Sequence, residues 1–165
     1  MENSFSKIIT LLFICFSITS QSQDKAGKQK QLETLLESKE FVFIPKTAIP
    51  QGFPTVNLSS SSNYLKIHPK TLEGNLPYFG RSYSATYGGD GGIQFSTAPT
   101  DYKLAKNKKN YEIKAIIKGE NDNYNLNLFI DFDGSATLNI SSNKRTSISY
   151  YGSISPPENK NESKD

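Results

Sequence analysis

The sequence predicts a mainly β protein, an antiparallel meander of about eight to ten strands with one N-terminal amphipathic helix. Three observations predict this class. Apolar and polar residues alternate with period two through most of residues 64–154, short turns separate the alternating segments, and a helical spacing of leucines occurs near the N-terminus. An open sheet of this size would leave its inner face in water, so the meander is expected to curl. The result is either a small barrel-like sheet, as in lipocalins, or a folded-over sheet.

The chain has 165 residues, and residues 1–22 are predicted to be a secretory signal peptide. Lys7 precedes an apolar run at 8–18, which is too short to cross a bilayer core of about 30 Å as a helix. Ser20 and Ser22 fit the small-x-small rule, so cleavage is expected after Ser22. The mature protein is then periplasmic or secreted and has no transmembrane span. An uncleaved membrane anchor is the competing interpretation.

Composition excludes several classes of function. The only cysteine, Cys15, lies inside the apolar run and follows Ile14, whereas a lipoprotein signal places a small residue before its lipidated cysteine. The mature chain therefore has no thiol for a disulfide, a metal site or a nucleophile. The net charge of +3 is too small and too scattered to predict nucleic-acid binding. No cofactor is predicted.

The mature length suits one domain. A helix is expected at 24–40, within an N-terminal segment 23–40, and its apolar stripe consists of Leu32, Leu35 and Leu36. Residues 41–154 are expected to form a single antiparallel β domain. The tail at 155–165 contains prolines, charges and asparagines with nothing to bury, so it is predicted to be disordered.

Eight segments alternate clearly enough to be predicted as strands: 64–68, 71–76, 92–96, 102–106, 111–118, 124–131, 136–141 and 147–154. A further strand is expected at 41–44 and a weaker one at 55–58. Because the connections are short, strands that are consecutive in sequence are expected to pair with each other.

Strand register can be predicted from the apolar face, because a shift of one residue turns every inward side chain outward. Pairing Ile117 with Tyr124 gives one wholly apolar face, on which the further pairs are Ala115 with Leu126, Ile113 with Leu128 and Tyr111 with Ile130. For the preceding hairpin, we expect Leu104 opposite Tyr111 and Tyr102 opposite Ile113, with a tight turn at 107–108.

The next hairpin is predicted to have a three-residue loop at 132–134. This loop length keeps the apolar face intact, since it pairs Ile130 with Ala136, Leu128 with Leu138 and Leu126 with Ile140. It also places Gly134 at the left-handed position of a bulge, where glycine has no steric penalty.

The segment 76–92 is the candidate functional site. Loops of this length are uncommon in compact domains and are often functional. It contains five glycines, and aromatic rings beside an arginine could stack on a planar ligand and bind a carboxylate or phosphate. The candidate ligand-binding residues are Tyr78, Phe79, Arg81, Tyr83, Tyr87 and Asp90. In the alternative interpretation, the loop folds across the mouth of the barrel and fills it with its own rings.

Other motifs predict no catalytic residue and no metal site. The glycine-rich stretch 88–92 lacks the Lys-Ser/Thr ending of a nucleotide-binding loop, and its single Asp supplies too few ligands for calcium. His68, the only histidine, precedes Pro69 and is expected to be a solvated turn residue rather than part of a triad or a zinc site.

Four stretches of the sequence resemble one known family. They are Leu76-Pro-Tyr-Phe-Gly-Arg continuing to Phe95, Asp101-Tyr-Lys, Gly134-Ser-Ala-Thr-Leu-Asn-Ile-Ser-Ser and Arg145-Thr-Ser-Ile-Ser-Tyr. The chain is similar, over essentially residues 31–154, to exported proteins of Gram-negative bacterial envelopes that share a domain of unknown function, family 4251 (DUF4251). The resemblance implies a periplasmic or envelope setting, and it implies no activity and no catalytic residues.

The function predicted from these observations is that of an exported, non-enzymatic binding or interaction module. Its loop 76–92 would contact a small ligand or an envelope protein. The first alternative is a hydrolase that acts on envelope glycans through paired carboxylates. The second is a purely structural protein in which the loop only caps the core.

Overall fold

The structure, a computed structural model, describes residues 20–60, 62–83, 91–119 and 122–157. Residues 1–19 of the predicted signal peptide 1–22 and residues 158–165 of the tail lie outside the described residues. The elements in chain order are α2 (Ser20–Ser38), β1 (Phe41–Pro50), β2 (Val56–Asn57), β3 (Tyr64–Ile67), β4 (Leu72–Leu76), β5 (Ile93–Thr97), β6 (Asp101–Lys106), β7 (Asn110–Lys118), β8 (Asn123–Asp131), β9 (Ser135–Ser142) and β10 (Ile148–Ser155). The mainly β prediction is confirmed.

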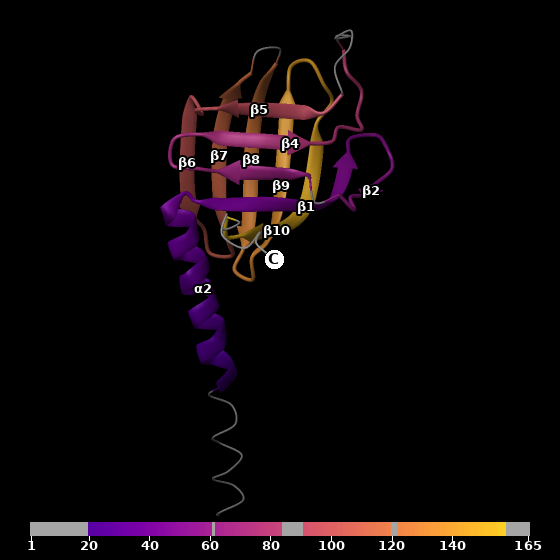
Figure 1. Cartoon of the computed structure of the whole chain (residues 1–165). Coiled ribbons are helices and arrows are strands. Elements are labelled where there is room, and N and C mark those ends of the chain that lie inside the picture. Colours follow the sequence, from indigo (N-terminus) through magenta and orange to yellow (C-terminus); the bar gives the residue numbers. More distant parts are fainter. Residues whose placement is uncertain (1–19, 61, 84–90, 120–121, 158–165) are drawn as a thin grey trace, which may run out of the picture.

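All the strands belong to one antiparallel sheet with the order β5-β4-β3-β1-β10-β9-β8-β7-β6, and the short β2 pairs with β1. Strands β5 and β6 lie at opposite edges of this order, although only residues 98–100 connect them. In Figure 1, β1, β3, β4 and β5 run across the direction of β6 to β9. The sheet is therefore curled over on itself into a half-barrel.

Consecutive strands pair as expected from β3 to β5 and from β6 to β10. The pairing differs at two places, because β5 does not pair with β6, and β1 pairs with the distant β10. Strand β1 is also longer than predicted, Phe41–Pro50, and includes two prolines. Its register with β10 shifts between Pro45 and Thr47, where a bulge accommodates a proline that cannot donate a hydrogen bond.

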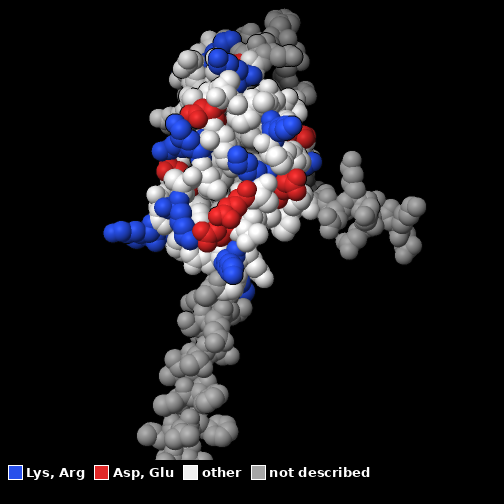
Figure 2. Space-filling model, turned by 90° about the vertical axis from the view of Figure 1, so that its left-hand side faces the viewer, with Lys and Arg blue, Asp and Glu red and all other residues white. Residues whose placement is uncertain are grey.

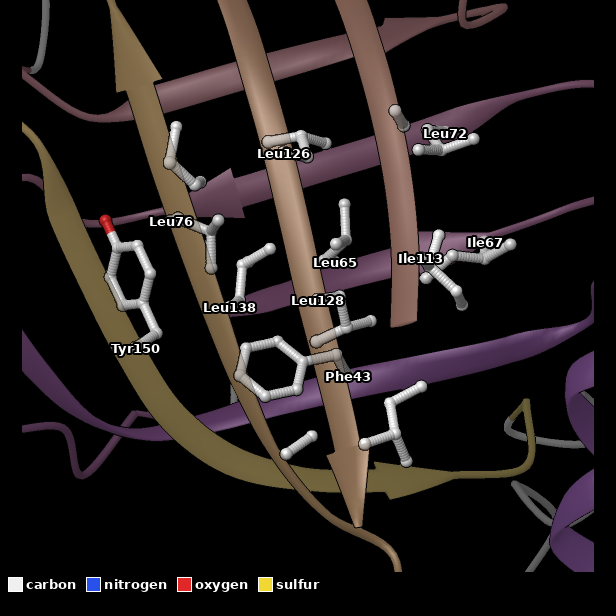
Figure 3. Close-up of a cluster of buried hydrophobic side chains, with 14 of the residues drawn as sticks. Phe43, Leu65, Ile67, Leu72, Leu76, Ile113, Leu126, Leu128, Leu138 and Tyr150 are labelled. Carbon is white, nitrogen blue, oxygen red and sulfur yellow. The ribbon is translucent and has the colours of Figure 1, made fainter. Parts of the chain in front are cut away.

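The corner of the half-barrel lies where β1 meets β10. In Figure 3, β10 bends from the direction of β9 to that of β1. At this bend the backbone of Gly152 approaches the carbonyl of Ile44 so closely that a Cβ would overlap it. A bulge beside a strand that changes direction is the usual way for one sheet to form two crossed layers.

The predicted register of β7, β8 and β9 is confirmed. Ile113 faces Leu128 and Leu128 faces Leu138, as the apolar face requires. The hairpin between β8 and β9 has the three-residue loop, and Gly134 has a φ of 87°. The left-handed backbone at this position explains why a glycine stands there.

The predicted register of β6 on β7 is wrong by two residues. Leu104 faces Ile113 and Lys106 faces Tyr111, and the turn is closed by a 2.8 Å hydrogen bond from the amide of Asn107 to the carbonyl of Asn110. A shift of two residues keeps the apolar face inward, so side-chain alternation alone cannot exclude it. The turn accordingly lies at 108–109 and not at 107–108 as expected.

The core lies between the two crossed layers of the sheet. Figure 3 shows side chains of β1, β3 and β4 meeting those of β7 to β10. The largest of the fully buried side chains include Phe41, Phe43, Leu65, Leu128, Leu138 and Tyr150. These side chains fill the interior, so the half-barrel is packed as a folded-over sheet and not as a lipocalin-like cup.

The C-terminal part of α2 packs on the sheet. Leu32 and Leu36 are buried against the core, and the Glu33 carboxylate accepts a 2.7 Å hydrogen bond from Lys106 at the end of β6. Figure 1 shows the rest of the helix extending away from the β domain. No helix in the described part of the chain is both long enough and apolar enough to span a membrane.

Figure 2 views the side of the molecule on which β6 lies in Figure 1. Basic and acidic side chains are interspersed over this side. The +3 net charge is therefore not gathered there into a patch of one sign.

Candidate functional site

The candidate loop starts directly after β4, and its first residues lie against the connection between β9 and β10. The amide of Thr146 donates to the carbonyl of Arg81 at 2.9 Å, and the amide of Tyr83 donates to the carbonyl of Lys144 at 2.8 Å. The Tyr78 hydroxyl lies 2.9 Å from both the carbonyl and the hydroxyl of Thr146. The first half of the loop is therefore anchored to a segment more than sixty residues away.

Arg145 is the central residue of this anchor. Its guanidinium carbon lies 5.2 Å from the centre of the Tyr78 ring, a cation–π contact. Its Nη1 donates to the carbonyls of Gly91 and Gly92 at 3.0 and 2.9 Å. One side chain therefore contacts both the start and the end of the loop.

Asp122 is the acidic partner of Arg145. Its side chain is 4% exposed, its Oδ2 lies 3.7 Å from Arg145 Nε, and its Oδ1 accepts a hydrogen bond from the amide of Asn123. A buried carboxylate needs a nearby cation, and Arg145 is the cation placed to supply it. The β7–β8 hairpin, the β9–β10 connection and the ends of the loop thus meet at one ion pair.

Tyr150, on β10, also binds the start of the loop. Its hydroxyl donates to the carbonyl of Pro77 at 2.7 Å, one residue before Tyr78. Burial raises the pKa of the Tyr150 hydroxyl above its ordinary value, so this group remains a neutral donor. We call Tyr78, Arg145, Thr146 and Tyr150 the loop anchor.

The structure separates the predicted site residues into two groups. Tyr78 belongs to the anchor, and its hydroxyl is used by the protein itself. Phe79 and Tyr83 are exposed by 38% and 67%, and Arg81 is also exposed. Tyr87 and Asp90 lie outside the described residues.

One exposed aromatic residue, in a segment that also binds the β9–β10 connection, was not predicted. Phe53 is 43% exposed and follows β1 in a segment whose Gln51 amide donates to the carbonyl of Ser147 at 3.0 Å. The segments of Phe53 and Tyr83 thus both bind the β9–β10 connection. We call Phe53, Phe79 and Tyr83 the aromatic rim. No local sequence signal marks Phe53, because its neighbourhood depends on the distant pairing of β1 with β10.

The space beside the anchor is small. A hollow lined by Tyr78, Tyr124, Arg145 and their neighbours is too narrow to admit a water molecule. A larger hollow of about 560 Å³ lies elsewhere, on the outer side of strands β6 to β10, and Asp101 is the one acidic residue among those that line it. Among the described residues, the hollow beside the anchor therefore offers no room for a ligand.

Within the described ranges, no three His, Cys, Asp or Glu residues are grouped as metal ligands would be. His68 is exposed, and its amide donates to the carbonyl of Thr71 in the turn between β3 and β4, as predicted for a turn residue.

A family model described as "Domain of unknown function (DUF4251)" matches residues 23–154, which cover β1 to β9 and nearly all of β10. The chain belongs to this family. The match confirms the resemblance carried by the Pro-Tyr-Phe-Gly-Arg and Gly-Gly-Asp-Gly-Gly stretches. The loop anchor and the aromatic rim are thus features of a DUF4251 domain.

The DUF4251 fold is also found in a solved structure. The crystal structure of a DUF4251 family protein from Bacteroides eggerthii DSM 20697 is similar to this chain with a TM-score of 0.61, at 19% sequence identity, over 79% of this chain and 89% of that one. At this identity the similarity establishes the fold alone. No curated protein matches the chain in sequence.

Proposed function

We propose that this DUF4251 protein is an exported, non-enzymatic binding module that uses its aromatic rim to contact another macromolecule of the bacterial envelope. Export is supported by Lys7, the apolar run at 8–18 and the cleavage motif that ends at Ser22. Cleavage there would remove the first three residues of α2 and leave its packed part intact.

One observation carries the proposal: exposed aromatic side chains stand on a rigidly anchored backbone. Tyr83 is 67% exposed, although the amide of the same residue is hydrogen-bonded to Lys144. Exposed aromatic groups on a fixed backbone lose little conformational entropy on binding, and aromatic residues are enriched at interfaces. The position of the rim therefore supports an interaction surface.

The small hollow that the described residues form beside the anchor favours a macromolecule over a small ligand. Small-molecule sites are concave and enclose most of their ligand. The hollow at Tyr78 and Arg145 is too narrow for a water molecule, and the rim residues Phe79 and Tyr83 are exposed. A protein surface or a polymer chain can cover such a rim without entering a pocket.

The glycan hydrolase gains no support from the described residues. A glycosidase needs two carboxyl groups about 5–9.5 Å apart in one concave site. Asp101 is the single acidic residue that lines the larger hollow, and none lines the smaller one.

A stability experiment separates the binding module from a purely structural protein. We expect Phe79→Ala and Tyr83→Ala each to change the free energy of unfolding in urea by less than about 0.5 kcal/mol, as exposed substitutions do. Tyr78→Ala removes an anchor and is expected to destabilise by about 2 kcal/mol. If Tyr83→Ala costs as much as Tyr78→Ala, the loop is a cap and the binding proposal fails.

An interaction experiment tests the rim directly. A photo-crosslinking residue in place of Tyr83, in the producing bacterium, is expected to give a discrete adduct with one envelope component. Phe53→Ala or Phe79→Ala in the same chain is expected to reduce the yield of that adduct at least fivefold. The same crosslinker in place of Lys66, on β3, is the control position. An adduct of equal yield from Lys66, or one insensitive to Phe79→Ala, contradicts the proposal.

A further inference from the structure

The outer side of strands β6 to β10 carries the larger hollow, of about 560 Å³. Its floor is a row of side chains that face one another across neighbouring strands, in the order Lys103, Lys114, Asn127, Asn139 and Ser149. Residues next to them in the strands, such as Ile113 and Leu128, are buried in the core, so the row faces the other way. The volume lies within the range of about 300–1,000 Å³ that ligand sites occupy.

The centre of the row presents amide and hydroxyl groups. The Asn127 Oδ1 atom is buried, and no group in the described part of the chain donates a hydrogen bond to it. The Ser149 hydroxyl donates to Asn139 Oδ1 at 2.6 Å. Because amide and hydroxyl groups both donate and accept, such a row matches a ligand whose own groups are hydroxyls.

The two lysines at one end of the row are each paired with a carboxylate. Lys103 Nζ lies 3.3 Å from Asp101 Oδ2, and Lys114 Nζ lies 3.0 Å from Glu112 Oε1. Each pair has no net charge, which favours a neutral ligand over a polyanion. A lone acidic residue, Asp101, among the lining residues suits binding and does not suit glycosidic cleavage.

Apolar side chains flank the polar row. Ile116 lines the hollow and is 38% exposed. Tyr151 lies beyond the residues that line the hollow. It is 47% exposed and stands two residues after Ser149, on the same side of β10. Ile49, 45% exposed, pairs with Ser149 from β1. Sugar rings have hydroxyl edges and C–H faces, so this combination of polar and apolar groups matches both.

We propose that this groove binds a neutral oligosaccharide. Asn127, Asn139 and Ser149 bind its hydroxyl groups, and Tyr151 packs against a ring face. A peptide is a poorer match, because β7, β8 and β9 are each paired on both sides and offer no free edge to an added strand. The site goes beyond the proposed function, since it uses the outer side of these strands and not the aromatic rim.

Titration of the mature chain, residues 23–165, with maltohexaose, cellohexaose and chitohexaose tests the groove by calorimetry and by saturation-transfer NMR. We expect at least one of these hexasaccharides to bind with a dissociation constant in the millimolar range or tighter. Asn127→Ala and Tyr151→Ala are each expected to weaken that binding at least tenfold. The matched control is Asn123→Ala, which changes the same residue type on the same side of β8 but outside the groove.

Circular dichroism of each variant checks that it is folded, because Asn127→Ala removes the side-chain hydrogen bond between Asn127 and Glu112 as well as an unpartnered oxygen. The groove is excluded if none of the hexasaccharides binds at millimolar concentration, if Asn123→Ala weakens binding as much as Asn127→Ala, or if a Gly-Ser hexapeptide binds as tightly. Loss of saccharide binding in Tyr83→Ala alone would place the ligand on the aromatic rim. That outcome overturns the groove while supporting the proposed function.

Discussion

The guanidinium of Arg145 lies over the ring of Tyr78, with 5.2 Å between the guanidinium carbon and the ring centre. The same guanidinium binds the carbonyls of Gly91 and Gly92 at the far end of the loop. The two ends of a long segment are thus held at one point, which fixes the backbone near Phe79 and Tyr83. The arginine that organises the loop comes from another part of the chain, whereas the loop's own Arg81 is exposed.

Replacing Arg145 is expected to destabilise the protein. Arg145→Ala removes the cation beside the buried Asp122 and leaves two backbone carbonyls without their donor, so we expect a loss of about 2 kcal/mol in the free energy of unfolding. Arg81→Ala is the control, with an expected change below about 0.5 kcal/mol. Urea unfolding of both variants measures the difference. Equal stability of the two variants would show that Arg145 is not the anchor.

Removing the hydroxyl of Tyr150 and removing that of Tyr102 are expected to have different effects on the stability of the protein. The Tyr150 hydroxyl donates to the carbonyl of Pro77, whereas the Tyr102 hydroxyl is buried with no partner in the described part of the chain. Tyr150→Phe should therefore cost about 1 kcal/mol at neutral pH, and Tyr102→Phe should be neutral or stabilising by up to about 1 kcal/mol. Thermal and urea unfolding of the two variants provide the comparison. The same sign for both would contradict the assigned hydrogen bonding.

Stability is expected to fall at alkaline pH. Burial raises the pKa of Tyr102 to about 12, and burial also raises the pKa of Tyr150. An unfolded tyrosine ionises near pH 10, so below that pH both states are neutral and the stabilisation is complete. Between about pH 10 and 12 the unfolded state ionises first, and the free energy of unfolding falls as pH rises.

Tyr102→Phe is the measurement that assigns this effect. The variant should lose about 1–2 kcal/mol less than the wild type between pH 9 and 12, a value reduced from the full shift because the side chain is partly exposed. Urea unfolding at a series of pH values gives the two curves. If the curves are parallel, Tyr102 does not titrate differently in the folded and unfolded states.

Much of the fold could be predicted from local alternation. From Tyr111 to Ile140 each residue on the apolar face finds its partner on the next strand, and the Asp133-Gly134 turn determines the register. The β6–β7 register was predicted wrongly by two residues, because both alignments place Leu104 on the apolar face and the turn sequence does not discriminate between them.

The pairing of β1 with β10 could not be predicted, since the two strands are separated by nearly the whole domain. Two features of the candidate site were also not predicted, the anchoring role of Arg145 and the position of Phe53. Arg145 has no sequence signal as an anchor, because its partners Gly91 and Asp122 belong to other hairpins. Phe53 has no sequence signal either, because its neighbourhood depends on the pairing of β1 with β10. The loop itself was identifiable from its composition, whereas the division of its aromatics into anchor and rim required the structure.

Gly134 is expected to resist substitution for a purely conformational reason. Its φ is 87°, and a Cβ there would meet nothing within 4 Å. Gly134→Ala should therefore cost about 1–2 kcal/mol through backbone strain alone. Gly27→Ala, inside α2 and also with open space around it, is the opposite control and should be neutral or stabilising by up to about 1 kcal/mol. Urea unfolding measures both, and a neutral Gly134→Ala would contradict the left-handed turn.

Gly152 tests the corner that closes the half-barrel. A Cβ at this position would overlap the carbonyl oxygen of Ile44 and lie 2.9 Å from the Cα of Pro45, so the clash is with backbone that cannot rotate away. We expect Gly152→Ala to cost more than about 3 kcal/mol, or to prevent folding, because β1 and β10 must separate at the bulge. Ser153→Ala, the next residue on the same strand, serves as the control and should stay within about 1 kcal/mol of the wild type. Circular dichroism and urea unfolding report the outcome. A Gly152→Ala variant as stable as Ser153→Ala would mean that the two layers of the sheet are not joined by this close approach.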